Sequence, residues 1–205
     1  MVDAADALDR LREGNRRFVA NTPDEALHTK RRALFVDGQM PFAIVLGCSD
    51  SRVPAELVFD AGLGDLFVIR VAGNIVAPSQ VGSVEFAATR YRTRLVVVLG
   101  HSQCGAILAT LDELRQPATE QSLNLRSIVE RVRPSVEPLL ESQLRSDPIA
   151  LVHHAVRANV RASVDHLRHG SVILEQLIAK DGLRVVGAEY SLETGEVDFF
   201  DAVVD

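Results

Sequence analysis

Three short segments of the chain are almost entirely apolar and show no alternation of polar with apolar positions. They run from Phe42 to Leu46, from Leu66 to Val71 and from Leu95 to Leu99, and each is dense in branched residues. This pattern is typical of strands buried on both faces of a parallel sheet. Helical patterns lie between them, at Pro54 to Phe59 and at Ser79 to Tyr91. The alternating order therefore predicts a layered α/β fold with right-handed crossovers.

The N-terminal segment has the pattern of an amphipathic helix. Asp3 is a suitable N-cap, and apolar residues follow it at helical spacing. These apolar positions are Leu8, Leu11, Phe18 and Val19. Such a helix covers either its own domain or a second subunit, and the pattern alone leaves both possibilities open.

The rest of the chain is predominantly helical and ends in two predicted strands. The predicted helices are Ala106 to Leu114, Ser122 to Val132, Pro134 to Leu144, Pro148 to Leu167 and Ser171 to Ala179. The strands, Leu183 to Tyr190 and Glu196 to Phe200, flank Glu193-Thr194-Gly195. A glycine in so short a connection favours a hairpin loop with a bulge.

Composition and charge narrow the class of protein. With 205 residues, 47% hydrophobic and 24% charged, we expect one domain, residues 1–205, with a substantial core. The net charge of -6 and a pI near 5.5 argue against nucleic acid as a partner. Acids near the start argue against an export signal, and no apolar run reaches the roughly 18 residues of a membrane span. We therefore expect a cytoplasmic protein without a membrane partner.

The cysteines and one histidine fall at informative places. Cys48 follows the first predicted strand and His101 follows the third, each directly after a glycine. The carboxyl ends of parallel strands are where open α/β sheets build their sites. Cys104 comes three residues after His101, on the first turn of a predicted helix.

Two thiolates and one imidazole suit Zn²⁺ in tetrahedral geometry and leave a fourth position free, as in a catalytic site. The alternative is that Cys48 is a small buried hydrophobe and that Cys104 only begins a helix. A disulfide is not expected, since a reducing compartment keeps the two thiols open.

The residues that follow Cys48 favour a metal-binding role for this cysteine over a purely structural one. Asp50 and Arg52 place a carboxylate and a guanidinium two residues apart, and an arginine so placed holds a carboxylate by two parallel hydrogen bonds. Asp50 then either occupies the fourth zinc position itself or is held back by Arg52 and accepts a hydrogen bond from zinc-bound hydroxide. The remaining alternative is a surface ion pair worth about 0–1 kcal/mol.

Two motifs together resemble the paired signature of the β-carbonic anhydrases: Cys48-Ser49-Asp50-Ser51-Arg52-Val53 and His101-Ser102-Gln103-Cys104-Gly105-Ala106. The resemblance extends over most of the chain. It continues through Glu13-Gly14-Asn15-Arg16-Arg17-Phe18, Phe67-Val68-Ile69-Arg70, Gly73-Asn74, Gly82-Ser83-Val84-Glu85-Phe86 and Val186-Gly187-Ala188-Glu189-Tyr190.

The resemblance implies reversible hydration of carbon dioxide to bicarbonate by attack of zinc-bound hydroxide, with one Zn²⁺ per chain. It assigns Cys48, His101 and Cys104 as zinc ligands, Asp50 as a ligand only in a closed state, and Asp50 with Arg52 as the catalytic pair. The residues that it places around the substrate are Gln39, Phe67, Ala72, Phe86 and Gly105. It also implies a central, mostly parallel sheet flanked by helices, an N-terminal helix that reaches across a partner, and a homodimer or homotetramer.

Two positions depart from the family pattern. Val71 stands where many relatives carry an asparagine, which puts a local hydrogen bond in doubt. Some members are regulated by bicarbonate at a tryptophan, an arginine and a tyrosine. Arg70 and Tyr190 match, but Val45 replaces the tryptophan, so we expect this regulatory site to be absent or weak.

Other functions remain alternatives to carbon dioxide hydration. One is a zinc-stabilised interaction protein in which Asp50 closes the site, and another is a hydrolase of a related linear molecule such as carbon disulfide. A thiol redox protein is disfavoured because Cys48 and Cys104 lack the Cys-x-x-Cys spacing.

Overall fold

A five-stranded sheet forms the centre of the computed structural model, which describes residues 2–28, 36, 38–116 and 122–200. The strand order is β2-β1-β3-β4-β5; the first four strands are parallel, and β5 is antiparallel to β4. Their bounds are β1 Ala43–Gly47, β2 Leu66–Arg70, β3 Leu95–His101, β4 Arg184–Tyr190 and β5 Val197–Asp198. The expected central, mostly parallel sheet is confirmed.

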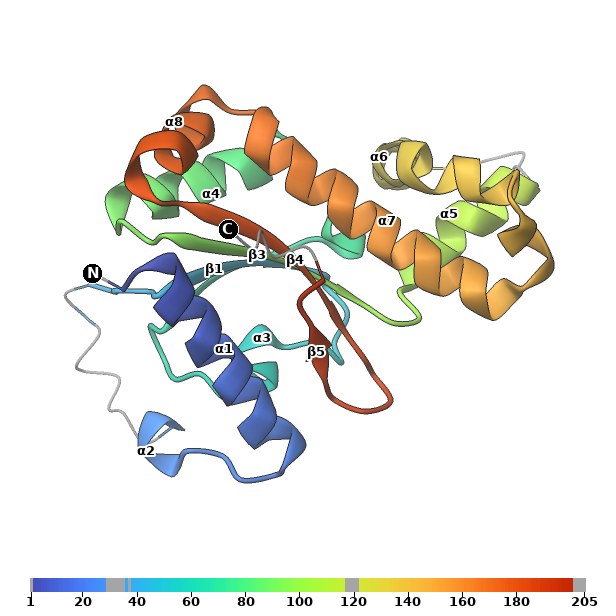
Figure 1. The fold of residues 1–205 in the computed structure, drawn as a ribbon. Helices are drawn as coiled ribbons and strands as arrows, with labels where there is room; N and C mark the ends of the chain where they lie inside the picture. The colour runs from blue at the N-terminus through green and yellow to red at the C-terminus, as the bar shows by residue number, and fades with distance from the viewer. Residues whose placement is uncertain (1, 29–35, 37, 117–121, 201–205) are drawn as a thin grey trace.

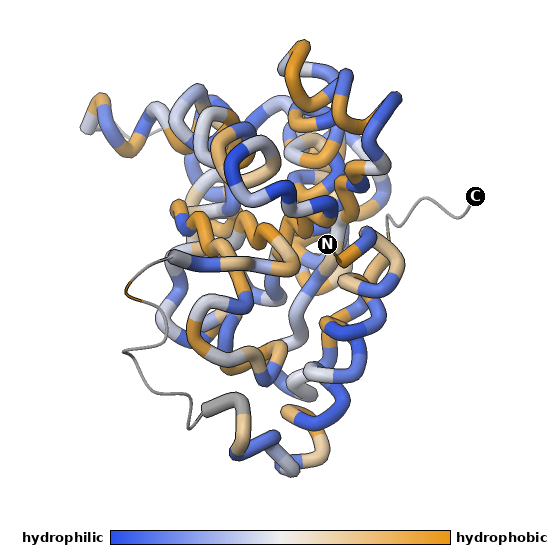
Figure 2. The backbone as a smooth tube through the Cα atoms, turned by 90° about the vertical axis from the view of Figure 1, so that its left-hand side faces the viewer, coloured by the Kyte–Doolittle hydropathy of each residue, from blue (hydrophilic) through white to orange (hydrophobic). Residues whose placement is uncertain are grey.

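Helices cover both faces of this sheet (Figure 1). One face is covered by α1 (Ala4–Val19) and α3 (Ala55–Val58), the other by α4 (Pro78–Arg90), α7 (Pro148–His169) and α8 (Val172–Asp181). The remaining helical elements are α2 (Glu25–His28), η2 (Ala72–Asn74), α5 (Gly105–Arg115), α6 (Leu123–Leu140) and η3 (Gln143–Ser146). Helices α5 and α6 pack against the first half of α7, beyond the edge of the sheet. Figure 2 shows hydrophobic segments concentrated in the interior between these layers.

Helix α1 begins as its sequence predicts. The carboxylate of Asp3 accepts a hydrogen bond from the backbone N–H of Asp6 at 2.8 Å, which satisfies one of the free donors of the first turn. Ala7 and Leu11 are fully buried against the sheet of the same chain. The apolar face thus has a partner within the chain, and an additional contact across a subunit boundary stays a prediction.

The middle of α1 is tied to two distant segments. At Gly14 a Cβ would lie only 1.9 Å from the carbonyl oxygen of Phe59, so no side chain fits at this crossing. The next residue, Asn15, donates to the carbonyls of Val58 and Gly195 and accepts from the N–H of Val197. Gly14 and Asn15 therefore fix α1 against α3 and the β4–β5 hairpin.

The prediction of two helices separated near Pro134 is wrong, because one helix, α6, continues through both Pro134 and Pro138. Each proline inside a helix costs about 3 kcal/mol. Against this, Val129, Val132 and Val136 are buried in the core shared with α5 and α7, and each contributes about 1.5–3 kcal/mol. Tertiary packing thus offsets the local penalty.

The C-terminal hairpin forms, but β5 is shorter than predicted. Gly195 lies in the left-handed region with φ +78°, as a tight connection of this kind requires, and its N–H donates to Ser191. Only Val197–Asp198 pairs with β4 as a strand.

Among the described residues, no helix is both long and apolar enough to cross a membrane.

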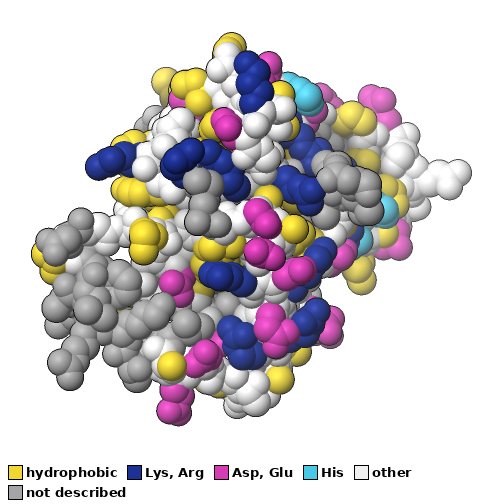
Figure 3. All heavy atoms as spheres, turned by 60° about the vertical axis from the view of Figure 1, so that its left-hand side comes forward, with side chains coloured by type: hydrophobic (Ala, Val, Ile, Leu, Met, Phe, Trp, Pro, Cys, Tyr) yellow, Lys and Arg dark blue, Asp and Glu magenta, His cyan; other side chains and the backbone are white. Residues whose placement is uncertain are grey.

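Acidic and basic side chains lie beside one another on the face shown in Figure 3. On α1, for example, Arg12 pairs with Asp9 at 3.1 Å and Arg16 pairs with Glu13. Both pairs are exposed, and exposed pairs contribute about 0–1 kcal/mol each. They set the mixed charge of this face and add little to the stability of the fold.

Candidate metal centre and active site

Three side chains with metal-binding atoms meet at the carboxyl edge of the sheet. Cys48 is the first residue after β1, His101 is the last residue of β3, and Cys104 is the N-cap of α5. All three are buried, with exposed fractions of 5%, 0% and 1%. Because β1 and β3 are neighbouring parallel strands, their ends bring together residues that are far apart in sequence.

The spacing of this cluster fits one tetrahedral ion. The sulfur atoms of Cys48 and Cys104 are 3.9 Å apart, and the ligand atoms of all three residues lie within 4.8 Å of one another. Two sulfurs at about 2.3 Å from a tetrahedral Zn²⁺ would be about 3.8 Å apart. The observed separation is also far too long for a disulfide, whose S–S bond is about 2.05 Å.

His101 is oriented for coordination through Nε2. Its Nδ1 lies 2.9 Å from the carbonyl oxygen of Ser102, and a carbonyl can only accept, so Nδ1 carries the proton. Nε2 is buried and has no hydrogen-bond partner among the described residues. A backbone carbonyl on one ring nitrogen and a free lone pair on the other is the usual environment of a metal-binding histidine.

The two sulfur atoms lie within hydrogen-bonding distance of each other. Hydrogen bonding from Cys104 lowers the pKa of Cys48 to about 4, and the backbone N–H of Gly73 acts in the same direction. The same bond to Cys48, together with burial, raises the pKa of Cys104. Cys48 is therefore prepared as a thiolate, and a bound cation would displace the remaining proton from Cys104.

Asp50 and Arg52 form a bidentate pair beside the cluster. The Nε and Nη2 atoms of Arg52 lie 2.9 and 2.8 Å from the two carboxylate oxygens, and the backbone N–H of Arg52 adds a third bond at 3.0 Å. These hydrogen bonds hold the pKa of Asp50 well below its usual range. Its Oδ2 lies 3.9 Å from Nε2 of His101. An ionised carboxylate thus borders the cluster while both of its oxygens are engaged by Arg52.

The turn that carries Cys48 and Asp50 is held from the neighbouring strand. Arg70, the last residue of β2, donates from Nε to the carbonyl of Cys48 at 3.0 Å and from Nη2 to the carbonyl of Asp50 at 2.6 Å. Sequence reasoning missed this role, since it considered Arg70 only for bicarbonate binding. The pairing of Gly47 with Arg70 in the sheet register brings the two segments together.

A second contact missed at the sequence level reaches the sulfur of Cys48. The backbone N–H of Gly73 donates to this sulfur at 3.4 Å. Gly73 has φ +71°, and a Cβ there would lie 3.1 Å from that of Ala106, so the close approach depends on glycine. The Gly73-Asn74 motif indicated this segment without revealing its contact.

Three residues predicted around the substrate lie away from the cluster. Gln39 donates to the hydroxyl of Tyr91 at 3.0 Å, and Phe67 and Phe86 also pack on Tyr91, at centroid distances of 6.0 and 5.6 Å. Phe67 is in register with Ile44, four residues before Cys48, which corresponds to about 13 Å along a strand. Within one chain the structure does not bring this aromatic cluster to the cysteines.

The other two predicted substrate residues lie next to residues of the cysteine–histidine cluster in the sequence. Ala72 precedes Gly73 at the start of η2, and Gly105 follows Cys104 as the first residue of α5. No Cβ contact within 4 Å restricts Gly105, so the space beside this residue is open among the described residues. Their backbones border the cluster, whereas their roles toward a substrate stay predictions.

The residues considered for bicarbonate regulation have other surroundings in this structure. Val45 is fully buried in β1, and Arg70 is committed to the carbonyls described above. Tyr190 is buried against Phe18, with ring centroids 6.4 Å apart. The expected weakness of such a site stays a prediction.

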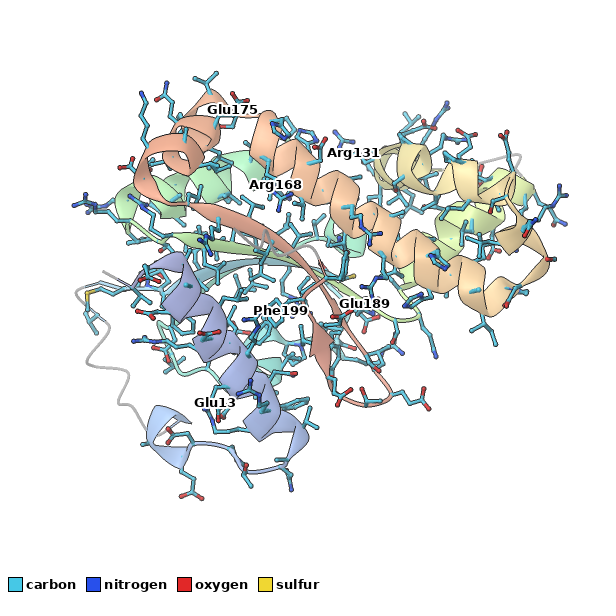
Figure 4. The ribbon with its side chains drawn as sticks, viewed as in Figure 1. Glu13, Arg131, Arg168, Glu175, Glu189 and Phe199 are labelled. Carbon is cyan, nitrogen blue, oxygen red and sulfur yellow. The ribbon has the colours of Figure 1, made fainter. Side chains whose placement is uncertain are left out.

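A buried carboxylate lies on the strand next to His101. Figure 4 shows Glu189 on β4, close to α7, and its register partner is Gly100. Its carboxylate is 3.4 Å from Nη1 of Arg157 and 3.5 Å from Nε2 of His153. Burial nevertheless raises its pKa. This ion cluster joins α7 to β4.

Comparison with known proteins gives consistent matches. A family model described as "Carbonic anhydrase" matches residues 43–197. The chain is 41% identical over 196 residues to carbonic anhydrase of Mycolicibacterium smegmatis, covering 94% of this chain and 91% of the relative. It is 40% identical over 190 residues to carbonic anhydrase 2 of Mycobacterium tuberculosis, covering 92% and 89%.

Solved structures show the same fold. The structure of a tetrameric β-carbonic anhydrase from the ascomycete Sordaria macrospora superposes with a TM-score of 0.68 at 26% identity. The alignment covers 80% of this chain and 82% of that one.

Proposed function

Because the chain belongs to the β-carbonic anhydrase family, we propose that it catalyses the zinc-dependent, reversible hydration of carbon dioxide to bicarbonate and a proton. The observation that carries this proposal is the buried set of two sulfurs and one imidazole, with an ionised carboxylate held beside it by an arginine.

The donor set of Cys48, His101 and Cys104 fits one Zn²⁺ per chain. Two thiolates balance the double positive charge, the sulfur separation matches tetrahedral coordination, and the unpartnered Nε2 of His101 completes the three ligands. When bound, Zn²⁺ lowers the pKa of water to about 7 and so supplies hydroxide near neutral pH.

Asp50 has the properties of an orienting acceptor. As an ionised carboxylate it can only accept hydrogen bonds, so it would accept one from the single O–H of a hydroxide nucleophile. A lone pair of the nucleophile is then left to attack the carbon of carbon dioxide. Arg52 keeps Asp50 both ionised and in place, because it binds the two carboxylate oxygens simultaneously.

The same pair favours an open site over a closed zinc site in an interaction protein. A carboxylate that closed the site would turn an oxygen to the metal and give up part of its bidentate bond to Arg52. In the structure both oxygens are engaged, at 2.8 and 2.9 Å. This arrangement supports a fourth position that is open to water.

We further propose that the active protein is a homo-oligomer, in which a second copy places an apolar surface over the cluster. Carbon dioxide is uncharged and needs apolar surroundings, yet Gln39, Phe67, Phe86 and Tyr91 lie at a distance from the cysteines of their own chain. Phe86 is 51% exposed, which leaves its ring available for such a contact. The Sordaria macrospora relatives are described as tetrameric, in support of this assembly.

The test is stopped-flow hydration of carbon dioxide, followed with a pH indicator on protein of measured zinc content, beside a Cys104→Ser variant. Fast hydration that requires zinc and is lost in the variant would support the proposal. One zinc per chain without hydration would overturn it and leave the closed-site interaction protein as the better explanation.

A further inference from the structure

Two polar side chains interrupt the apolar face that α7 turns toward the interior. Asn159 and Ser163 are 2% and 5% exposed and stand one turn apart, between Val156, Val160 and Val164. Asparagine is a poor residue for a helix interior, and a buried amide is costly unless its hydrogen bonds are satisfied. Their presence on this face therefore needs a partner that packing alone does not supply.

That partner is the backbone of η2. The side-chain amide of Asn159 donates to the carbonyl of Gly73 at 2.8 Å, and the hydroxyl of Ser163 donates to the carbonyl of Asn74 at 3.1 Å. Figure 1 shows η2 against the middle of α7. Two successive carbonyls are thus held by one helix.

The segment so held has an unusual backbone. Gly73 and Asn74 both lie in the left-handed region, with φ +71° and +43°. Glycine and asparagine are the residues that best tolerate this region, and two successive residues in it form a tight bend that contacts from neighbouring elements can hold in place. The bonds from Asn159 and Ser163 provide that restraint.

The restrained segment contacts the sulfur of Cys48, a predicted metal-binding atom. The N–H of Gly73 donates to the sulfur of Cys48 at 3.4 Å, and the carbonyl of the same residue accepts from Asn159, so the bond from Asn159 restrains the residue that carries this donor. A hydrogen bond to a ligating thiolate orients the sulfur and tunes its donor strength. A continuous path therefore runs from α7 through Gly73 to the sulfur of Cys48.

We propose that Asn159 is a positioning residue for the metal centre, which acts through the N–H of Gly73 on the thiolate of Cys48, with Ser163 in a supporting role. This inference rests on the zinc site of the proposed function. It goes beyond that function in assigning part of the metal affinity to a helix that contributes no ligand of its own.

The experiment compares Asn159→Leu and Ser163→Ala with the wild type by zinc competition against a chromophoric chelator. The leucine keeps the branching of asparagine at Cγ and removes the donor. We expect the zinc dissociation constant to rise about tenfold for Asn159→Leu, at the lower end of the range for groups that support metal ligands, and less for Ser163→Ala. In the Co²⁺-loaded proteins, the thiolate-to-metal absorption band should move to longer wavelength, because the sulfur has lost a hydrogen bond.

Val164→Ala is the matched control, since this residue is 1% exposed, lies on the same face of α7 and has an apolar side chain that donates no hydrogen bond to η2. It should lower stability without changing the zinc affinity or the band. A zinc affinity of Asn159→Leu within twofold of the wild type, or an equal loss in Val164→Ala, would overturn the inference. If Asn159→Leu does not fold, Asn159→Ala, which removes the same donor without added volume, is measured by the same criteria. Zinc binding without hydration by the wild type would instead refute the proposed function and leave this comparison valid.

Discussion

The contact between β3 and α7 limits the size of the residue that precedes His101, a predicted metal ligand. At Gly100 a Cβ would lie 2.5 Å from Cγ2 of Val160 and 3.3 Å from Cγ1 of Val156, whereas carbon atoms in contact are normally about 3.5–4.0 Å apart. The substitution Gly100→Ala must therefore displace α7 or strain the strand. Overpacking of this kind costs about 1–3 kcal/mol.

The size of the effect can be tested with a partner substitution. Val160→Ala removes two buried methyl groups, worth about 1.6 kcal/mol by transfer alone and about 2–3 kcal/mol with the cavity that remains. In Gly100→Ala/Val160→Ala the new methyl group occupies the vacated space. We expect the double variant to lose about 1–2 kcal/mol less than the sum of the single variants.

The assay is urea unfolding followed by circular dichroism, at one protein concentration because oligomerisation makes stability depend on concentration. Additivity of the two single effects to within about 0.5 kcal/mol would show that the two positions do not compete for the same space, and would refute the reasoning.

Two further predictions concern charged groups. The Arg52→Leu variant should still bind zinc but hydrate carbon dioxide about 10- to 100-fold more slowly, because Asp50 loses the group that orients it. Unchanged turnover in stopped flow would contradict this role of Arg52. Burial raises the pKa of Glu189, so its contribution to stability is lost as the pH rises through the folded-state pKa. Glu189→Gln should therefore lose less stability than the wild type in urea unfolding as the pH rises above the ordinary glutamate pKa of 4.5, and parallel pH curves would count against a raised pKa at this position.

Much of the fold and of the metal cluster could be predicted because both depend on local signals. Uninterrupted apolar runs indicate strands buried on both faces, and parallel strands of one sheet end at one edge. Cys48 and His101 follow such runs, so their proximity could be expected before the structure was known. The paired motifs then pointed to one family.

Features that depend on packing between distant segments could not be predicted. The bond from Asn159 to Gly73 joins residues 86 positions apart, and neither position carries a local signal for it. The continuity of α6 through Pro134 arises from burial against α5 and α7, which a local penalty does not reveal. The distance of Phe67 from the cysteines follows from its register with Ile44, and register is a property of the assembled sheet.

The most direct test of the central claim is the return of activity to metal-free protein as zinc is added. Protein stripped with a chelator and titrated with Zn²⁺ should recover carbon dioxide hydration linearly and reach a plateau at one zinc per chain. Full activity in the metal-free protein, or no activity at the plateau of zinc binding, would contradict the assignment of Cys48, His101 and Cys104 to a catalytic zinc site.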